Sequence, residues 1–231
     1  MKKFLKDWTI FEKLLFCSST IMILILGICS KSNFLTIFAA LSDIVTALLL
    51  SKGKSSGQLS GIVSCTLCLI ISFKNNYYGE VLIYLLLKIP MYIIGSLSWI
   101  KHKNKETNTI SVNSINKKEW LIISGVSSLV FVVMYYLLRL FNTSELLVST
   151  ISVVTGLIAA YLLFRRSKYG FIFYVVGDII LMALWGIPIV RGNLTLLPML
   201  IGPLINAIND SYGIYNWYKL EKLQNLVKQA K

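Results

Sequence analysis

The chain has 231 residues, of which 56% are hydrophobic and 14% are charged. Soluble domains carry about 25% charged residues, so the composition excludes an ordinary soluble domain of this length. The formal net charge of +13 would suit a nucleic-acid-binding protein, but the Lys and Arg residues gather between long apolar segments instead of forming one basic surface. We therefore expect a membrane protein that has the lipid bilayer, and no nucleic acid, as its partner.

Eight long segments contain at most one charged residue each. Those without any charge are 14–30, 55–73, 120–138 and 146–164. Those with one are 32–51 (Asp43), 81–100 (Lys88), 169–190 (Asp178) and 192–218 (Asp210). Crossing the hydrocarbon core takes roughly 20 apolar residues, and backbone groups in lipid must bond within the segment, which favours helices. The sequence predicts an all-α integral membrane protein of about eight transmembrane helices.

Connections with several positive charges alternate along the chain with connections that have one. If the N-terminus is cytoplasmic, 18 Lys and Arg residues lie on the cytoplasmic side and only four on the other, namely Lys31, Lys74, Arg139 and Arg191. Cytoplasmic loops carry such an excess. We expect a multi-pass protein of the bacterial inner (cytoplasmic) membrane with both termini in the cytoplasm. The first segment has no small-x-small cleavage site, so we expect it to be retained as a span.

The two halves of the sequence end alike, in Gly95-x-x-x-Trp99-x-Lys101 and Gly213-x-x-x-Trp217-x-Lys219. We expect each Trp in the aromatic belt at the cytoplasmic surface. The preceding segments match in order and length, and a shift of four spans keeps the direction, which predicts two parallel repeats. The predicted parts are an extra N-terminal helix (1–31), a first three-helix repeat (32–101), a cytoplasmic loop with a linking helix (102–145), a second three-helix repeat (146–219) and a cytoplasmic tail (220–231).

Ionisable side chains within spans are costly, and by default they face a bundle interior or an aqueous cavity. The predicted substrate-binding residues are Tyr84, Lys88, Tyr92, Asp178, Trp185, Asn206, Asn209 and Asp210. Tyr84, Lys88 and Tyr92 are spaced by four and should share one helix face. A structural interpretation stays open for all eight: an ion pair of Lys88 with one of the two aspartates, interhelical hydrogen bonds from the asparagines, and packing for the aromatic residues.

Two further acidic residues, Asp43 and Glu80, are assigned to the ends of spans, where solvation is cheap, and receive no role in the site. Pro90, Pro198 and Pro203 interrupt the fourth and eighth segments, and Gly202-Pro203 resembles a kink. Kinked helices at matching places in two repeats are typical of transporter binding sites, but these prolines are not in exact register.

The segment Tyr78-Gly79-Glu80-Val81-Leu82, followed by Ile89-Pro90-Met91-Tyr92 and Trp99, resembles the PnuC family of vitamin and nucleoside transporters. Asn206-Ala207-Ile208 and Tyr212-Gly213-Ile214-Tyr215-Asn216-Trp217 resemble its last helix, and Ser51-Lys52-Gly53-Lys54 is similar too. The resemblance implies three helices, a linking helix and three helices, as in SWEET sugar transporters with inverted orientation. It also implies facilitated diffusion, typically of nicotinamide riboside that is retained by phosphorylation, and it is consistent with a homotrimer.

The sequence differs from this family at positions that recognise the substrate in the family. Family members for nicotinamide riboside commonly have Gln where Tyr92 stands and Asn where Tyr84 stands. Their Trp-x-x-Trp-x-x-x-Asn pattern corresponds here to Gly170, Phe173 and Gly177. We expect an importer of a nucleoside-like vitamin precursor such as nicotinamide riboside, with a deoxynucleoside, thiamine or another aromatic metabolite as the alternative.

Two other classes are less well supported. A membrane-embedded enzyme usually needs clustered carboxylates with a metal, or His arrays, whereas the only His is His102. Cys65 and Cys68 lie one turn apart without a further ligand nearby, so we interpret them as packing residues. We expect no enzymatic activity, no metal and no cofactor. A structural or sensory subunit is disfavoured by two repeats without a soluble signalling domain.

Overall fold

The computed structural model describes residues 8–29, 34–74, 81, 84–102, 109–143, 145–192 and 197–229. The helices along this part of the chain are α1 (Ile10–Cys29), α2 (Phe34–Ser51), α3 (Ser56–Lys74), the π-helix η1 (Tyr84–Lys88), α5 (Ile89–Lys101), α6 (Lys117–Leu140), α7 (Leu146–Phe164), α8 (Tyr169–Val190) and α9 (Leu197–Gln229). Among the described residues, four helices, α1, α2, α6 and α7, are long and apolar enough to cross a membrane. The segments Ser56–Ile70 and Tyr169–Leu184 are shorter apolar helices. The predicted all-helical architecture is therefore confirmed.

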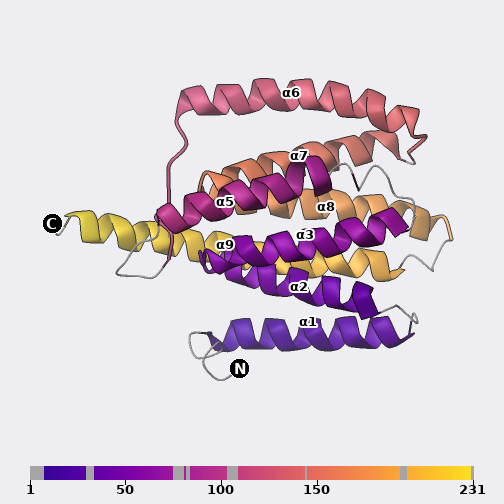
Figure 1. Ribbon diagram of the computed structural model, residues 1–231, viewed down its shortest axis with the longest axis horizontal. Coiled ribbons are helices and arrows are strands. Elements are labelled where there is room, and N and C mark those ends of the chain that lie inside the picture. The colour runs from indigo at the N-terminus through magenta and orange to yellow at the C-terminus, as the bar shows by residue number, and fades with distance from the viewer. Residues whose placement is uncertain are drawn as a thin grey trace.

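The long helices lie side by side, with α1 at one edge of the array and α6 at the opposite edge (Figure 1). Between these edges, α2 packs on α3 and α7 packs on α8. Two further contacts join segments far apart in the sequence, since α2 packs on α9 and α5 packs on α7. The helices of residues 34–101 thus contact those of residues 146–229 at two interfaces, α2 with α9 and α5 with α7.

The outer surface of the two edge helices is apolar. On α6, Leu121 and Leu140 are 77% and 82% exposed, and on α1, Ile10 and Ile28 are 78% and 74% exposed. A continuous apolar surface of this kind is unfavourable in water. It matches the hydrocarbon of a bilayer, so these faces are the lipid-facing sides of the array.

The turn from α2 to α3 and the turn from α7 to α8 have the same backbone geometry. Gly53 has a φ of 65° and Arg166 a φ of 61°. The amide of Gly53 donates to the carbonyl of Leu50 at 2.9 Å, and the amide of Arg166 donates to that of Leu163 at 2.9 Å. The left-handed region is readily open to glycine but strained for arginine, so the surrounding contacts must hold Arg166 in place.

Trp99 and Trp217 lie inside the protein, next to these turns. Each is 0% exposed, and their ring centroids are 5.6 Å apart. The indole of Trp99 donates to the carbonyl of Leu163 at 3.1 Å, and that of Trp217 donates to the carbonyl of Leu50 at 3.1 Å. The expectation of an aromatic belt at the membrane surface was wrong for both residues. The two carbonyls belong to the last turns of α2 and α7, and each accepts an indole hydrogen in addition to the amide hydrogen of its own turn.

An extended segment, residues 109–116, which we name the strap, crosses the same end of the array before α6 begins. Ile110, which is 0% exposed, donates its amide hydrogen to the carbonyl of Gly53 at 3.1 Å. Asn113 donates its amide hydrogen to the carbonyl of Arg166 at 2.9 Å. The side chain of Gln224 bonds the strap twice, to Ile110 and to Val112, both at 2.9 Å. Gln224 can reach the strap because α9 continues as a helix beyond the expected end of its span.

α6 is fastened to α7 by an ion pair. The guanidinium of Arg165 donates from Nε and Nη2 to the two carboxylate oxygens of Glu119, at 2.5 and 3.0 Å. The hydrogen bond from Glu119 raises the pKa of Arg165 above its ordinary value, against the opposing effect of burial. Bidentate pairing of this kind fixes orientation as well as distance.

A π-helical turn, η1, precedes α5. Pro90 is near the start of α5, and because proline has no amide hydrogen, the carbonyl one turn earlier loses its regular donor. π-helical turns are frequent at functional sites in helices. Here the turn contains Tyr84 and Lys88, two of the residues predicted to bind substrate.

Candidate functional site

A cluster of ionisable side chains lies among the helices, and we name it the central cluster. Its members interact electrostatically with one another and come from six helical elements: Asp43 of α2, Cys65 of α3, Lys88 of η1, Tyr92 of α5, Tyr174 and Asp178 of α8, and Asp210 of α9. Ionisable groups within membrane-spanning helices are rare and usually mark a substrate or ion pathway. The cluster draws on both sets of helices, so it lies where the two sets meet.

Asp43 and Lys88 form the charged pair of opposite sign in the cluster. The carboxylate of Asp43 is attracted by Lys88 and accepts a hydrogen bond of 3.3 Å from Ser64. The Nζ atom of Lys88 lies 4.7 Å from the ring centroid of Tyr84, within the range of a cation–π contact. The sequence analysis assigned Asp43 to the end of a span, but it lies near the middle of α2, so that assignment was wrong.

Asp43 also indicates open space among the helices. Groups of α3, η1, α8 and α9 act on it, yet Asp43 is exposed, as is Lys88. A side chain that is surrounded by other helices and still accessible borders a space large enough for water. Ligand sites between helices of a bundle have this character.

Asp178 and Asp210, which we name the acid pair, lie at the buried side of the cluster. They are 6% and 8% exposed, and their carboxyl groups lie close enough to act on each other electrostatically. Asn209, 2% exposed, donates from Nδ2 to Oδ1 of Asp210 at 3.3 Å. Within the described part of the chain, Oδ2 of Asp178 and Oδ1 of Asn209 are buried without a hydrogen-bond partner.

Unsatisfied buried acceptors are expensive, at about 1–3 kcal/mol each. A functional site is one common explanation when they occur together. The two acceptor atoms at the acid pair lack donors, so the groups that would satisfy them are N–H, O–H or a cation. The acid pair is therefore a place for a ligand that is a hydrogen-bond donor or positively charged.

Tyr92 narrows the space beside the cluster. A Cβ added to Gly61 of α3 would overlap the ring of Tyr92, so the ring lies directly against the α3 backbone. Electrostatic interactions link Tyr92 to Tyr174 and to Asp210. The aromatic side chain thus packs on α3 at Gly61 and lies within electrostatic range of Asp210, in the position where the resemblance led us to expect a Gln.

Of the eight predicted residues, Lys88, Tyr92, Asp178 and Asp210 belong to the central cluster, while Tyr84 contacts it through Lys88 and Asn209 through Asp210. Asn206 lies one turn before Asp210 on α9 and is half-buried. The backbone of Trp185 belongs to α8, and its side chain lies outside the described residues, as does all of Glu80. Within the described residues, no group of three or more His, Cys, Asp or Glu residues could hold a metal ion.

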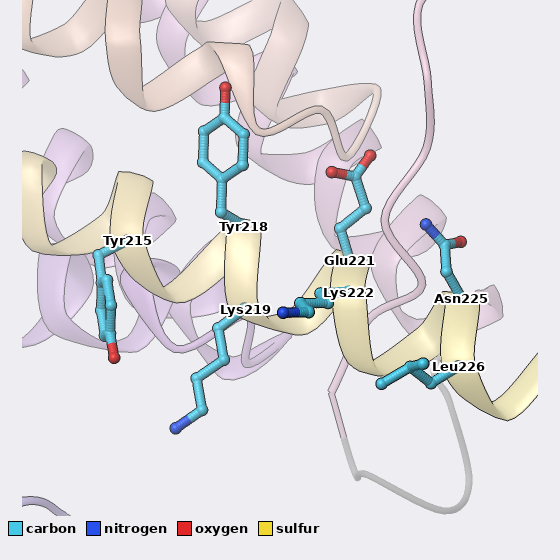
Figure 2. A pocket seen from close by; sticks show the side chains of 7 residues that line it. All are labelled: Tyr215, Tyr218, Lys219, Glu221, Lys222, Asn225 and Leu226. Carbon is cyan, nitrogen blue, oxygen red and sulfur yellow. The ribbon is translucent and has the colours of Figure 1, made fainter.

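Two surface hollows lie elsewhere on the described part of the chain. One, of about 630 Å³, is lined only by the far end of α9, by Tyr215, Tyr218, Lys219, Glu221, Lys222, Asn225 and Leu226 (Figure 2). Another, of about 500 Å³, lies between Phe11 of α1 and residues 204–212 of α9. Neither contains a residue of the central cluster. A hollow lined by the outer face of a single helix has no opposing wall, so we do not regard it as a substrate site.

Comparison with known proteins identifies the family. The sequence profile of the nicotinamide mononucleotide transporter family matches residues 33–219. The chain belongs to this family. Its members are transporters, so the chain is a transporter and not an enzyme, and the resemblance to the PnuC proteins is confirmed.

Individual relatives cover nearly the whole chain. The nicotinamide riboside transporter PnuC of Neisseria mucosa is 25% identical over 219 residues, which are 93% of this chain and 83% of that protein. The protein of the same name from Haemophilus influenzae is 22% identical over 97% of this chain and 96% of its own. The crystal structure of the vitamin B3 transporter PnuC has a TM-score of 0.78 at 24% identity, with 94% of each chain covered. The family thus shares the fold of this multi-pass membrane protein.

The sequence analysis missed Asp43, Ser64 and Tyr174. Tyr174 could have been found, because it precedes Asp178 by four residues and therefore shares its helix face. Asp43 could have been found from its place in the middle of an apolar segment, by the argument that was applied to Lys88 and Asp178. Ser64 carries no such signal, since serine is common wherever membrane helices pack closely.

Proposed function

We propose that this chain imports nicotinamide riboside by facilitated diffusion through the space bordered by the central cluster. The observation that carries the proposal is the pair of buried acceptors at Asp178 and Asn209, which lack donors within the described residues. Nicotinamide riboside has a positively charged pyridinium ring together with amide and hydroxyl donors, which match acceptors of this kind. The names of the relatives from Neisseria mucosa and Haemophilus influenzae support the same substrate.

We further propose that the transport unit consists of two parallel three-helix repeats joined by α6, with α1 as the extra helix, at the boundaries predicted from the sequence. The paired turns at Gly53 and Arg166 support this division. So does the reciprocal bonding of Trp99 to Leu163 and of Trp217 to Leu50. In transporters built from repeats, substrates bind where the repeats meet, which agrees with the central cluster.

We assign the end of the array with the two paired turns to the cytoplasm of a bacterium and the chain to its inner membrane. α1 begins and α9 ends at that same end (Figure 1). Lys52, Lys54, Arg165, Arg166 and Lys168 lie in the two turns there, as the positive-inside bias favours. A homotrimer remains a prediction, which light scattering of the detergent-solubilised protein would test.

The alternative substrates are a deoxynucleoside, thiamine or another aromatic metabolite. The observation in their favour is the ring of Tyr92, which fills the space beside Gly61 and would stack on a flat ligand more readily than Gln would. Thiamine is also a cation, so it satisfies the charge argument equally well.

The test is uptake of labelled compounds into proteoliposomes that contain the purified chain. We expect saturable uptake of nicotinamide riboside, and inhibition of that uptake by an excess of the unlabelled compound. Thiamine and deoxynucleosides are measured in parallel, and the compound with the highest kcat/KM is the substrate.

Asp178→Asn should lower uptake at least tenfold, because it removes the charge of one acceptor group. The matched control is Glu145→Gln, which removes a carboxylate that pairs with Arg191 at the start of α7. If none of the compounds shows saturable uptake, the proposal is wrong.

A further inference from the structure

The two surface hollows lie along one exposed face of α9. The hollow between α1 and α9 is lined by Phe11 of α1 and by Leu204, Ala207, Ile208, Ser211 and Tyr212 of α9, and the second hollow begins at Tyr215. Residues three or four positions apart keep to one side of a helix, so the two hollows follow each other along α9. α1 and α9 touch between them, where the ring centroids of Phe11 and Tyr212 lie 4.8 Å apart. We name the side of α9 that borders both hollows the α9 face.

The chemistry of the α9 face changes in order along the helix. Leu204 and Ile208 are exposed and apolar, and Tyr215 is 63% exposed. Lys219 and Lys222 follow, and both are exposed. The side chains of Tyr215 and Lys219 extend to the same side of α9 (Figure 2). Apolar, aromatic and basic groups occur in this order where a helix leaves the hydrocarbon and enters the headgroup layer.

The two lysines of the α9 face have no acidic partner within the described part of the chain. Glu221 is the acidic residue nearest to them in the sequence, and its side chain points to the side of α9 opposite Lys219 (Figure 2). There it accepts a hydrogen bond of 2.6 Å from Nζ of Lys168. None of the ion pairs among the described residues contains Lys219 or Lys222. The group that complements them is therefore an anion from outside this part of the chain.

We propose that the α9 face binds one anionic phospholipid, with its phosphate at Lys219 and Lys222 and an acyl chain in the hollow between α1 and α9. From Tyr212 to Leu204 the helix rises about 12 Å, and one leaflet contributes about 15 Å of hydrocarbon. The hollow thus matches an acyl chain within a single leaflet. Lys219 lies about 10 Å from Tyr212 in the other direction, and its long apolar stem lets the ammonium group reach the headgroup layer. The lipid site is independent of the substrate that the central cluster takes.

A second copy of the chain fits the α9 face less well than a lipid does. Copies in one membrane share one orientation, so their lysines would lie at the same level, and like charges repel each other. Each chain carries a formal net charge of +13, which adds to the repulsion. An anionic headgroup attracts basic residues near the membrane surface. The hollow beyond Tyr215 has α9 as its single protein wall, and the headgroup layer of the bilayer supplies the other wall.

The first test compares two lipids with identical acyl chains by native mass spectrometry of the purified, detergent-solubilised chain. Phosphatidylglycerol is anionic, and phosphatidylcholine has no net charge. We expect phosphatidylglycerol to bind about 25-fold more tightly, because each of the two lysines contributes about fivefold at an anionic surface. The double variant Lys219→Gln with Lys222→Gln should lose this preference. The control, Lys117→Gln with Lys118→Gln, removes the same charge from the exposed start of α6 and should keep it. Equal binding of the two lipids, or equal losses in the two double variants, overturns the inference.

The second test fills the hollow between α1 and α9. Ala207→Leu puts a branched side chain into the hollow and should lower the affinity for phosphatidylglycerol several-fold, although both lysines remain. Gly125→Leu on α6 is the matched control, because nothing lies within 4 Å of its added Cβ, and it should leave the affinity unchanged. Unchanged lipid binding by Ala207→Leu overturns the inference, and a simultaneous loss of oligomers from the mass spectrum would assign the hollow to a second copy. If Ala207→Leu does not fold, the lysine variants still decide the question.

Discussion

The hydroxyl group of Tyr212 donates a hydrogen bond of 2.9 Å to Oε1 of Glu12, 200 residues earlier in the chain. The other oxygen of Glu12 lies 2.6 Å from Nζ of Lys52 and accepts the amide hydrogen of Thr9 at 2.7 Å. Since Thr9 in turn accepts the amide hydrogen of Glu12 at 3.2 Å, the two residues form a capping box. One carboxylate, 2% exposed, thus fastens the start of α1 to the α2–α3 turn and to α9.

The ion pair of Glu12 and Lys52 should contribute strongly to the stability of the packing of α1. Glu12→Gln removes the carboxylate charge from its pair with Lys52, whose side chain is 10% exposed, and breaking a buried ion pair in this way costs about 3 kcal/mol. The melting temperature in detergent should fall clearly. Glu221→Gln is the control, because it removes a more exposed pair with Lys168, where about 1 kcal/mol or less is expected. Equal shifts for both variants would contradict the prediction.

The two buried indoles should be equivalent in their contribution. Trp99→Phe and Trp217→Phe each keep an aromatic ring but remove one buried hydrogen bond, at about 1 kcal/mol each, while the carbonyl keeps the amide donor of its turn. We expect similar decreases in melting temperature. The rings touch each other, so the double variant should deviate from the sum of the single ones. A loss confined to one of the two positions would argue against equivalent roles.

Gly61 should matter for transport more than for folding. Gly61→Ala puts a methyl group into the ring of Tyr92, and the ring must move toward the acid pair or into the open space. Uptake in proteoliposomes should fall about tenfold or more. Gly125→Ala on α6 is the matched control, because nothing lies within 4 Å of its added Cβ. Equal uptake by the two variants would show that Tyr92 does not border the path.

Gln224 should hold the strap in place. Gln224→Ala removes both of its bonds to the strap, and the amide of Val112 loses its acceptor. Hydrogen exchange followed by mass spectrometry should become faster in the peptide that contains residues 109–113. Asn225→Ala, at an exposed neighbouring position, should leave the exchange rate of that peptide unchanged. Unchanged exchange in Gln224→Ala would mean that the bonds to Gly53 and Arg166 suffice.

The helices could be predicted from the sequence because the bilayer imposes one requirement on every span, namely a long apolar segment with few charges. Lys88 and Asp178 stand out against such a background, so most of the central cluster was found as well. The partners of these residues could not be predicted, since they depend on which helices touch. Lys88 acts electrostatically on Asp43, and Asp178 and Asp210 act on each other, whereas the sequence analysis had left open an ion pair of Lys88 with Asp178 or Asp210.

The tryptophans illustrate the other limit of sequence reasoning. A Trp followed by Lys at the end of an apolar segment is typical of the membrane interface, and the same pattern fits a Trp that turns inward. Which of the two occurs depends on an acceptor from a distant helix, here the carbonyls of Leu163 and Leu50. Burial of this kind depends on the folded chain and cannot be predicted from the neighbouring sequence.

The strap limits how far the α2–α3 and α7–α8 turns can separate. It binds Gly53 through Ile110 and Arg166 through Asn113, and the chain between these two positions, even fully extended, reaches only about 10 Å. A helix rearrangement that widened this end of the array beyond that reach would have to break one of the two bonds first. The backbone of residues 110–113 therefore acts as a tether of fixed length, and opening of the carrier at this end begins with its release.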